Sequence, residues 1–393
     1  MNAYLKEAQS MQSELSAWRR YLHENAELGF ELPKTIDFVT EKLESFGYEV
    51  KKIGGGLTCC VGSGSPVLLI RADMDALPIT EESGESFACK TGAAHACGHD
   101  FHATMLLGAA KILKEHEAEL KGTVKFMFQP AEELLKGSLS MIDAGILKNP
   151  TGDAAMGFQM NFGPLGDFDL HPGCMSYAPG QMMFSADEFK ITVKGRMAHG
   201  SSAFQGVSAV NAASLIANTF NSVLALEIPC DEAALLIVGA IQSGNAGNII
   251  PDTATIIGSF RAYTVETREF IRQRVEDITM GIARATRTTA TIEYTASVAP
   301  VVNNKELAAE MVGYCEEVMD KVQAIPPVKG SEDFANLGLH VPIFFANVCA
   351  GDPSDGYAYG MHNPKARISE DALPYGVAAH CNCAVNWLAN HSK

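Results

Sequence analysis

The chain has 393 residues and a formal net charge of −16; 47% of its residues are hydrophobic and 19% are charged. An acidic excess of this size excludes a nucleic-acid partner, because binding to phosphates requires an excess of Lys and Arg. The composition is that of a globular protein, and because no run of about 18 apolar residues occurs, we expect no membrane span.

The length predicts the number of domains, and the cysteines indicate the cellular compartment. A chain of this length exceeds one hydrophobic core, which predicts two domains. The first residues lack the apolar segment of a secretory signal. The ten cysteines are therefore expected to be reduced thiols and not a disulfide framework, which predicts a cytoplasmic protein.

Two helices are predicted before the first buried strand. Met11, Leu15, Trp18 and Leu22 recur at helical spacing and indicate one amphipathic helix. A second helical pattern covers about residues 34–46.

The next segments alternate strands with polar clusters. The apolar run 67–70 fits a strand buried on both faces, and it leads into Arg71-Ala-Asp73-Met-Asp75. A second strand, 123–128, runs into Gln129-Pro-Ala-Glu132-Glu133, and a third ends at 155–159. Strands that alternate with helices predict an α/β sheet, in which ligands bind beyond the carboxyl ends of the strands.

The stretch from His95 to Phe101 concentrates groups that bind metals or handle protons. It reads His-Ala-Cys-Gly-His-Asp-Phe, and an apolar helical pattern begins directly after it. Cys97 and His99 can turn toward one point if the backbone between them is a loop, which suits a metal ion. A buried thiol beside a helix-capping Asp100 would explain the same residues, so this stretch alone leaves both interpretations open.

From about residue 184 the pattern changes. Residues 189–194 alternate apolar and polar side chains, which indicates a half-exposed strand. A helix over about 206–226, two strands, a second helix and a final strand over 290–294 follow. The order β-α-β-β-α-β is that of a ferredoxin-like α+β sandwich, so we expect an inserted domain over 184–296.

After residue 296, predicted helices and strands alternate again as in the first part of the chain. Residues 1–183 and 297–393 are therefore expected to form one discontinuous domain. A helix is predicted near 305–320, a strand over 341–348 and a last helix over about 369–390. His380-Cys381-Asn-Cys383 looks like a metal motif, but neighbours two apart on a helix point in different directions, so we expect core packing.

Several catalytic classes are excluded by missing motifs. The chain has no Gly-x-Ser-x-Gly elbow, no Walker A motif and no Gly-x-Gly-x-x-Gly fingerprint. The chemistry therefore falls to a set of residues in loops that follow strands or precede helices: Asp75, Cys97, His99, Glu132, Glu133 and His362. One of the adjacent glutamates could bind a metal while the other takes a proton from water. A solvated acidic pair at a helix start and a lone structural His362 are the competing interpretations.

The sequence resembles the N-acyl amino acid amidohydrolases, the branch of hippurate hydrolases and indoleacetyl-amino acid hydrolases. That branch belongs to the aminoacylase and carboxypeptidase-type dinuclear metallohydrolases. The resemblance covers about residues 15–380 in order and spacing. It rests on six motifs: His23-Glu-x-x-Glu27-Leu-Gly-Phe-Glu31, Arg71-Ala-Asp-Met-Asp-Ala-Leu-Pro, His95-Ala-Cys-Gly-His-Asp, Gln129-Pro-Ala-Glu-Glu, Ala198-His-Gly and Gly330-Ser-Glu-Asp-Phe.

The resemblance implies a zinc-peptidase-like α/β catalytic domain and an inserted lid or dimerisation domain. It implies two divalent ions per subunit, Mn, Zn, Co or Ni, held by Cys97, His99, Glu133 and His362. Glu132 would be the general base and Asp75 a carboxylate that orients a ligand. His199 would stabilise the oxyanion, often from the neighbouring subunit of a homodimer, and Asn248 and Arg261 would hold the carboxylate of the substrate.

The chain departs from the family pattern at one position. A histidine ligand is usual after the strand that follows the Glu-Glu pair, and Gln159 stands there instead. Glutamine is a neutral oxygen donor and a poor partner for zinc beside thiolate and imidazole. Gln159 could bind an ion weakly, one metal site could be lost or altered, or the whole active site could be degraded.

The resemblance implies a metal-dependent amidohydrolase that cleaves a small N-acyl amino acid to a carboxylic acid and a free amino acid. A metallo-carboxypeptidase or dipeptidase on the same fold is the alternative within the enzyme class. A catalytically silent homologue that binds a ligand is the alternative outside it.

Overall fold

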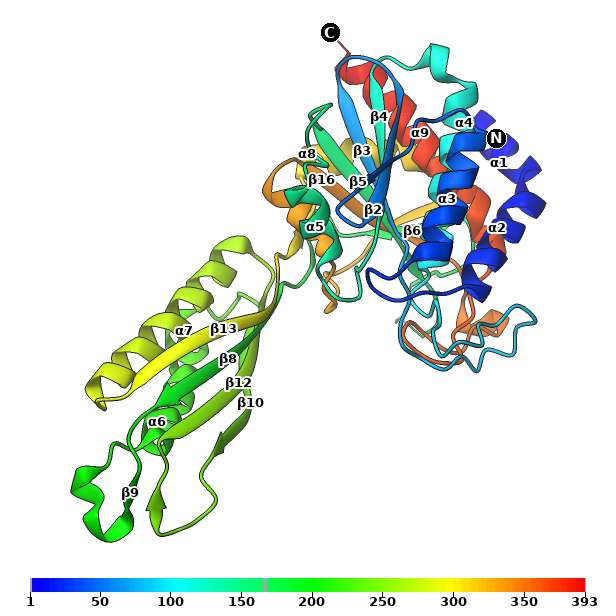
Figure 1. Ribbon diagram of the computed structural model, residues 1–393. Helices are drawn as coiled ribbons and strands as arrows, with labels where there is room; N and C mark the ends of the chain where they lie inside the picture. The colour runs from blue at the N-terminus through cyan, green and yellow to red at the C-terminus, as the bar shows by residue number, and fades with distance from the viewer. Residues whose placement is uncertain (1, 165–167, 393) are drawn as a thin grey trace. The chain divides into compact units, whose positions relative to one another are not determined.

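The computed structural model describes residues 2–164 and 168–392, which form two compact units (Figure 1). The first unit comprises Met1–Met182, Asn303–Pro327 and Asp333–Lys393. The second comprises Met183–Val302 and Val328–Glu332, so it contains the segment 184–296 and also takes in a short return of the chain near residue 330.

The first unit is built on an eight-stranded mixed sheet. Across the sheet the strands are β1 (Lys51–Ile53), β2 (Gly56–Gly62), β4 (Thr123–Gln129), β3 (Val67–Asp73), β5 (Ala154–Asn161), β16 (Ile343–Cys349), β6 (Cys174–Tyr177) and β15 (Lys321–Ala324). Its four central strands, β4, β3, β5 and β16, are parallel to one another and almost wholly buried, which explains their continuous apolar sequences. The predicted α/β sheet is confirmed.

Helices gather on one side of this sheet in Figure 1. Helix α4 (His99–Glu115) packs on the sheet, on α2 (Gln12–Glu24) and on α9 (Leu373–His391), with α1 (Ala3–Ser10) and α3 (Pro33–Ser45) beside them. The expected single N-terminal helix is divided, because the helical hydrogen bonding is interrupted at Met11 between α1 and α2.

Shorter helices complete the first unit. Helix α5 (Gly137–Asp143) and the turn η4 (Asp333–Leu339) pack on each other and on central strands, and α8 (Lys305–Glu316) packs on β16 and α9. The remaining short elements of this unit are η1 (Glu117–Glu119), η5 (Pro353–Asp355) and η6 (Glu370–Ala372), while the strands β7 (Gln181–Met183) and β14 (Val301–Val302) lie where the chain passes into and out of the second unit.

The second unit is the predicted ferredoxin-like sandwich. Its antiparallel sheet has the order β10 (Ala234–Ser243), β12 (Thr253–Ala262), β8 (Ala186–Lys194), β13 (Thr289–Val298). Helices α6 (Ala209–Ser222) and α7 (Val265–Ala285) cover one face, where Phe189, Ile191 and Val193 of β8 form the core. The short strands β9 (Ala198–His199) and β11 (Ile249–Ile250) pair with each other, and η2 (Gly200–Gln205) follows β9.

One segment of the second unit is long and apolar enough to cross a membrane by length and composition alone. The segment covers Ala209–Glu227 and consists of α6 and the short helix η3 (Val223–Glu227) that directly follows it. One face of this helix, including Ala212, Ile216 and Phe220, is buried against the sheet of the same unit. Packing of this kind accounts for the apolar sequence as a core helix.

Candidate metal centre

The loop before α4 brings a thiol and an imidazole together at the carboxyl end of the central strands. Gly98, between Cys97 and His99, has φ +90°, a left-handed conformation that favours glycine. A Cβ atom at Gly98 would also come within 2.8 Å of Cγ of Met160, so only glycine fits this close approach. Cys97 and His99 are both buried, as the metal-cradle interpretation requires.

The two glutamates lie in a turn directly after β4. The backbone N–H groups of Glu132 and Glu133 donate to the carboxylate of Asp75, at 2.9 and 3.2 Å. The same carboxylate lies 3.5 Å from Nδ1 of His99, so Asp75 ties the two loops together. Glu132 is only 6% exposed, which rules out a solvated acidic pair at a helix start.

His362 reaches the same place from the loop after β16. Its backbone N–H donates to the carbonyl of Ala96 at 2.9 Å, and this bond fixes the loop beside Cys97. Nε2 of His362 lies 3.7 Å from Oε1 of Glu133. Ligand atoms of Cys97, Glu133 and His362 all lie within 4.8 Å of one another.

The residues present fit a divalent ion. Neither ring nitrogen of His99 nor Oε1 of Glu133 has a hydrogen-bond partner among the described residues, although all three atoms are buried. Nε2 of His99 is 3.8 Å from Oε1 of Glu133. Ligands that lie about 2.1 Å from one tetrahedral ion are roughly 3.4 Å apart, so these spacings suit a shared ion better than a hydrogen bond.

Electrostatics in the centre favour a cation. Burial raises the pKa of Glu133 to about 7 and that of the Cys97 thiol to about 12. Burial alone would lower the pKa of His99, but Asp73 and Cys97 raise it well above its usual value. A bound cation would favour the ionised thiol and carboxylate over their protonated forms.

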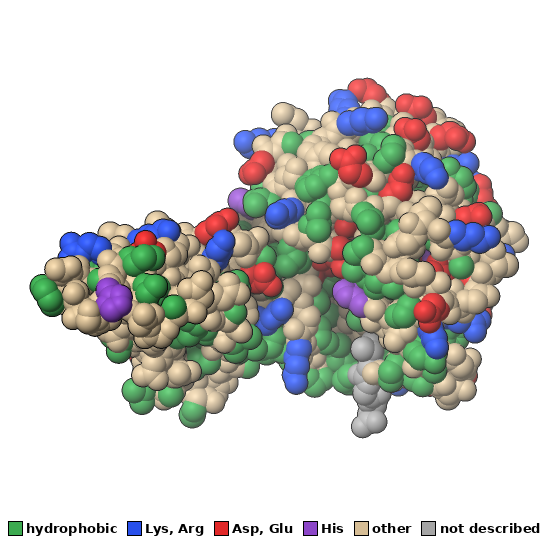
Figure 2. All heavy atoms as spheres, turned by 60° about the horizontal axis from the view of Figure 1, so that its bottom comes forward, with side chains coloured by type: hydrophobic (Ala, Val, Ile, Leu, Met, Phe, Trp, Pro, Cys, Tyr) green, Lys and Arg blue, Asp and Glu red, His purple; other side chains and the backbone are tan. Residues whose placement is uncertain are grey.

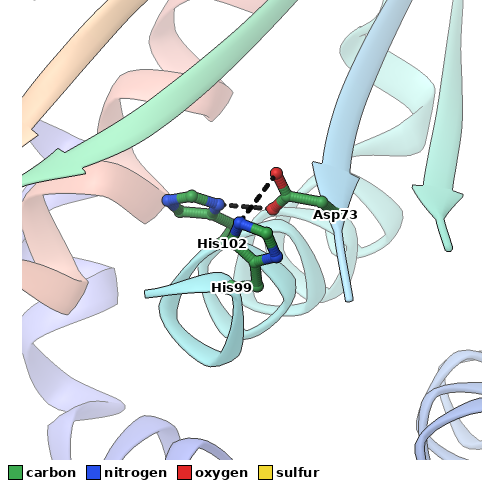
Figure 3. A group of neighbouring side chains, drawn as sticks. All are labelled: Asp73, His99 and His102. Atoms are coloured by element: carbon green, nitrogen blue, oxygen red, sulfur yellow. Dashed lines mark hydrogen bonds and ion pairs between the residues drawn. The ribbon is translucent and has the colours of Figure 1, made fainter. Parts of the chain in front are cut away.

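Asp73 and His102 also belong to the centre, although they were not among the predicted site residues. Figure 3 shows the carboxylate of Asp73, at the end of β3, facing the rings of His99 and His102 from the first turn of α4. Nδ1 of His102 is hydrogen bonded to Asp73, and its Nε2 accepts the backbone N–H of Met160 at 3.0 Å. In the sequence, the i, i+3 spacing of the two histidines could have indicated that they share one helix face.

Arg71 holds Asp73 in its ionised form. Its guanidinium lies 2.8 Å from Oδ2 of Asp73, and both side chains are buried. Burial opposes ionisation of Asp73, but the charge of Arg71 and the neighbouring imidazole of His102 bring its pKa below the usual value. Arg71 also donates to Gln129 at 2.9 Å and to Asp333 at 3.1 Å, which ties β3, β4 and η4 together at this edge of the sheet.

Gln159 lies on β5 beside Cys97. Its Oε1 accepts the backbone N–H of Met160 at 2.9 Å, and its Nε2 is 3.5 Å from Sγ of Cys97. The side chain is buried, with 9% exposure.

The other predicted site residues lie in the second unit. His199 is exposed and follows the end of β8, with its ring hydrogen bonded to Ser201, and Asn248 lies beside it because Gly200 donates to the carbonyl of Asn248 at 2.8 Å. Arg261 is near the far end of β12, where it donates to Ser331 at 2.7 Å. Asn248 precedes β12, and this strand runs about 26 Å, at 3.3 Å per residue, from Thr253 to Arg261, so it carries Arg261 toward the opposite end of the sheet.

A buried thiol, imidazole and carboxylate cluster at the carboxyl edge of an α/β sheet defines a metallohydrolase type of site. The model of the peptidase family M20/M25/M40 matches residues 69–386, and the chain belongs to this family of amide-bond hydrolases.

Individual relatives span nearly the whole chain. An IAA-amino acid hydrolase ILR1-like 2 of Arabidopsis thaliana is 36% identical over 94% of this chain and 84% of its own length. The hippurate hydrolase of Campylobacter jejuni is 36% identical over 84% of this chain and 86% of its own. A dinuclear metal binding peptidase of the M20 family from Bacillus subtilis superposes with a TM-score of 0.79 and 28% identity, covering 97% of this chain and 99% of that one.

Proposed function

We propose that the protein hydrolyses the amide bond of small N-acyl amino acids with the help of divalent metal. The observation that carries the proposal is the convergence of Cys97, Glu133 and His362 beside the buried Glu132. The names of relatives that hydrolyse acyl amino acids over nearly the full chain support this substrate class.

Four side chains would offer metal ligands: Cys97, Glu133 and His362 around one ion, and His99 beside Glu133. A thiolate with imidazoles and a carboxylate suits borderline ions such as Zn, Co, Ni or Mn. When bound, a divalent ion lowers the pKa of water and polarises a carbonyl oxygen. Asp75 would keep His99 and the glutamate turn in position through the contacts it makes with both.

Glu132 would act as the general base. Its carboxylate would accept a proton from the attacking water, whose oxygen forms the new bond to the acyl carbon. It would then return that proton to the amide nitrogen as the C–N bond breaks, so a carboxylic acid and a free amine leave. Burial of Glu132 and the anchoring of its backbone by Asp75 support this role.

A homodimer would complete the site. His199 follows β8, which runs about 26 Å, at 3.3 Å per residue, away from the end of the sheet where the chain enters and leaves the second unit. We propose that a second copy supplies His199 to stabilise the oxyanion, and Asn248 to share the substrate carboxylate with Arg261. Support comes from the exposed edge strand β10, where Ile237 is 53% exposed, and from the apolar side chains at the surface of this unit (Figure 2).

We also propose that the enzyme works in the cytoplasm. All ten cysteines are free thiols in the structure, which suits a reducing compartment.

The substrate class is tested by amine release from a panel. Metal-loaded protein is offered acetyl, benzoyl and indoleacetyl amino acids together with two dipeptides. Faster release from the acyl conjugates than from the dipeptides is expected. Preference for the dipeptides would favour the carboxypeptidase alternative, and silence from folded, metal-loaded protein would favour a homologue that only binds its ligand.

A further inference from the structure

We infer that Gln159 donates a hydrogen bond to Cys97 and ligates no metal, so that the centre holds one divalent ion tightly on Cys97, Glu133 and His362. The inference rests on the proposed metal centre and specifies how many ions it takes. It follows from the orientation of the Gln159 amide and from the tasks of the neighbouring side chains.

The amide of Gln159 has its oxygen turned to the backbone. Oε1 accepts the N–H of Met160 at 2.9 Å, and rotating the amide by half a turn would place two N–H donors against each other. Nε2 therefore faces Sγ of Cys97, at 3.5 Å. An amide nitrogen has no lone pair available for a metal, so the group that meets the sulfur is a donor and not a ligand.

The side chain of His102 cannot replace the missing ligand. One of its ring nitrogens is hydrogen bonded to Asp73, and the other lies 3.0 Å from the nitrogen of Met160 and shares that N–H with Oε1 of Gln159. Both are therefore occupied in holding β3, α4 and β5 together.

A second ion beside His99 would consequently have few ligands. Asp75 is engaged by two backbone N–H groups, and Asp73 is engaged by Arg71 and His102. His99 would contribute one imidazole, and Glu133 would have to be shared with the first ion. The first ion has a thiolate, a carboxylate and an imidazole, which matches the three protein ligands usual for a catalytic zinc site.

Metal stoichiometry tests the inference without using activity. Metal-free protein is titrated with Co²⁺, and the bound metal is measured by equilibrium dialysis while the sulfur-to-cobalt absorption band reports the Cys97 site. We expect one tight ion per chain in the unaltered protein and at least 100-fold weaker binding of a second. Gln159→His should bind two ions tightly. Gln159→Leu should keep one ion with its affinity reduced by less than about 100-fold, because losing a hydrogen bond to a metal ligand typically costs about 10–100-fold in affinity.

A matched control adds a histidine elsewhere. Gln181 is exposed on β7, and Gln181→His should leave the stoichiometry at one. Two equally tight ions in the unaltered protein, or a 100-fold loss of the first ion in Gln159→Leu, would overturn the inference and leave the proposed function standing. If the unaltered folded protein bound no Co²⁺ at all, the inference and the proposed metal centre would both fall. The comparison of the unaltered protein with Gln159→His decides the question even if Gln159→Leu does not fold.

Discussion

Glu132 and Glu133 are neighbours in sequence for which we propose different tasks. Oε1 of Glu133 faces the imidazoles of both His99 and His362, as a ligand would. The roles of such adjacent residues can be proposed from the sequence because consecutive side chains in an extended turn point in different directions. The sequence cannot show Asp75 holding both backbone N–H groups, because the contact joins residues 57 and 58 positions apart.

Replacing Glu132 tests whether this residue acts as a general base and not as a metal ligand. Glu132→Gln should lower the rate of hydrolysis by about 10²–10⁴-fold, the usual contribution of a general base, because the amide cannot accept the proton of the attacking water. Metal content, measured by atomic emission, should stay unchanged. Glu133→Gln is the contrasting variant and should lose both metal and activity. Near-normal turnover by Glu132→Gln would remove Glu132 from the mechanism.

His380 shows a residue whose metal-like sequence context is misleading. Its ring is buried in α9 and stacks on Phe158 with the centroids 4.3 Å apart, and Cys381 and Cys383 are also buried, as predicted for core packing. Burial, with a smaller effect of His102, lowers the pKa of His380 to about 3.

This pKa predicts a pH-dependent stability. Because the folded state keeps His380 neutral, stability is lost as the pH falls from about 6.5 toward 3, by about 1.4 kcal/mol per pH unit. His380→Leu should therefore be less sensitive than the unaltered protein over that window, with the two slopes equal above pH 7. Urea unfolding of both metal-free proteins at pH 7.5, 6.5 and 5.5 measures the difference. Parallel pH profiles at all three values would show that His380 does not titrate between the folded and unfolded states.

At the scale of elements, the parallel strands bring the centre together. β3, β4 and β5 each end in polar residues, and the register that pairs Asp73 with Gln129 places those residues at one edge. This gathering can be predicted from continuous apolar runs followed by polar clusters. The break between α1 and α2 could not, because the apolar spacing continues across Met11.

Gly98 tests how the loop geometry supports the metal. Gly98→Ala adds a strained left-handed residue and a Cβ that meets Met160, so unfolding free energy should fall by more than the 1–2 kcal/mol of the backbone strain alone. Gly92→Ala is the matched control, since Gly92 has φ +88° and open space around it. Urea unfolding and Co²⁺ affinity should both be reduced further in Gly98→Ala than in Gly92→Ala. Equal effects of the two substitutions would mean that the loop tolerates the added methyl group.

At the scale of the molecule, the sequence predicts the fold of each of the two domains but only some of the residues at which one domain passes into the other. Alternating strands and two amphipathic helices are sufficient to predict the β-α-β-β-α-β unit. Residues 328–332 belong to that unit in the structure. The segment is too short to show a hydrophobic periodicity, so the sequence pattern alone assigns it to the other domain. Asn248 and Arg261 were both predicted as substrate ligands, but β12 extends between the two positions. The sequence of one chain does not show whether a second copy brings such residues together.

The proposed dimer makes a prediction at this scale. Ile237→Lys places a charge on the exposed edge strand β10, which should convert a dimer to monomers and reduce activity, because a monomer lacks the second copy's His199. Sedimentation velocity measures the change. Leu139→Lys, at an exposed position of α5 in the first unit, should stay dimeric and active. A fully active monomer of the unaltered protein would contradict the proposed completion of the site.

The most direct test of the central claim is the rate of amine release from an N-acyl amino acid before and after removal of metal. Treatment with a chelator, followed by its removal, should abolish hydrolysis, because Cys97, Glu133 and His362 would then surround no cation to activate water. Adding back Mn²⁺, Zn²⁺ or Co²⁺ should restore it in at least one case, with no recovery in Glu132→Gln. Undiminished hydrolysis by protein shown by atomic emission to be metal-free would contradict a metal-dependent amidohydrolase.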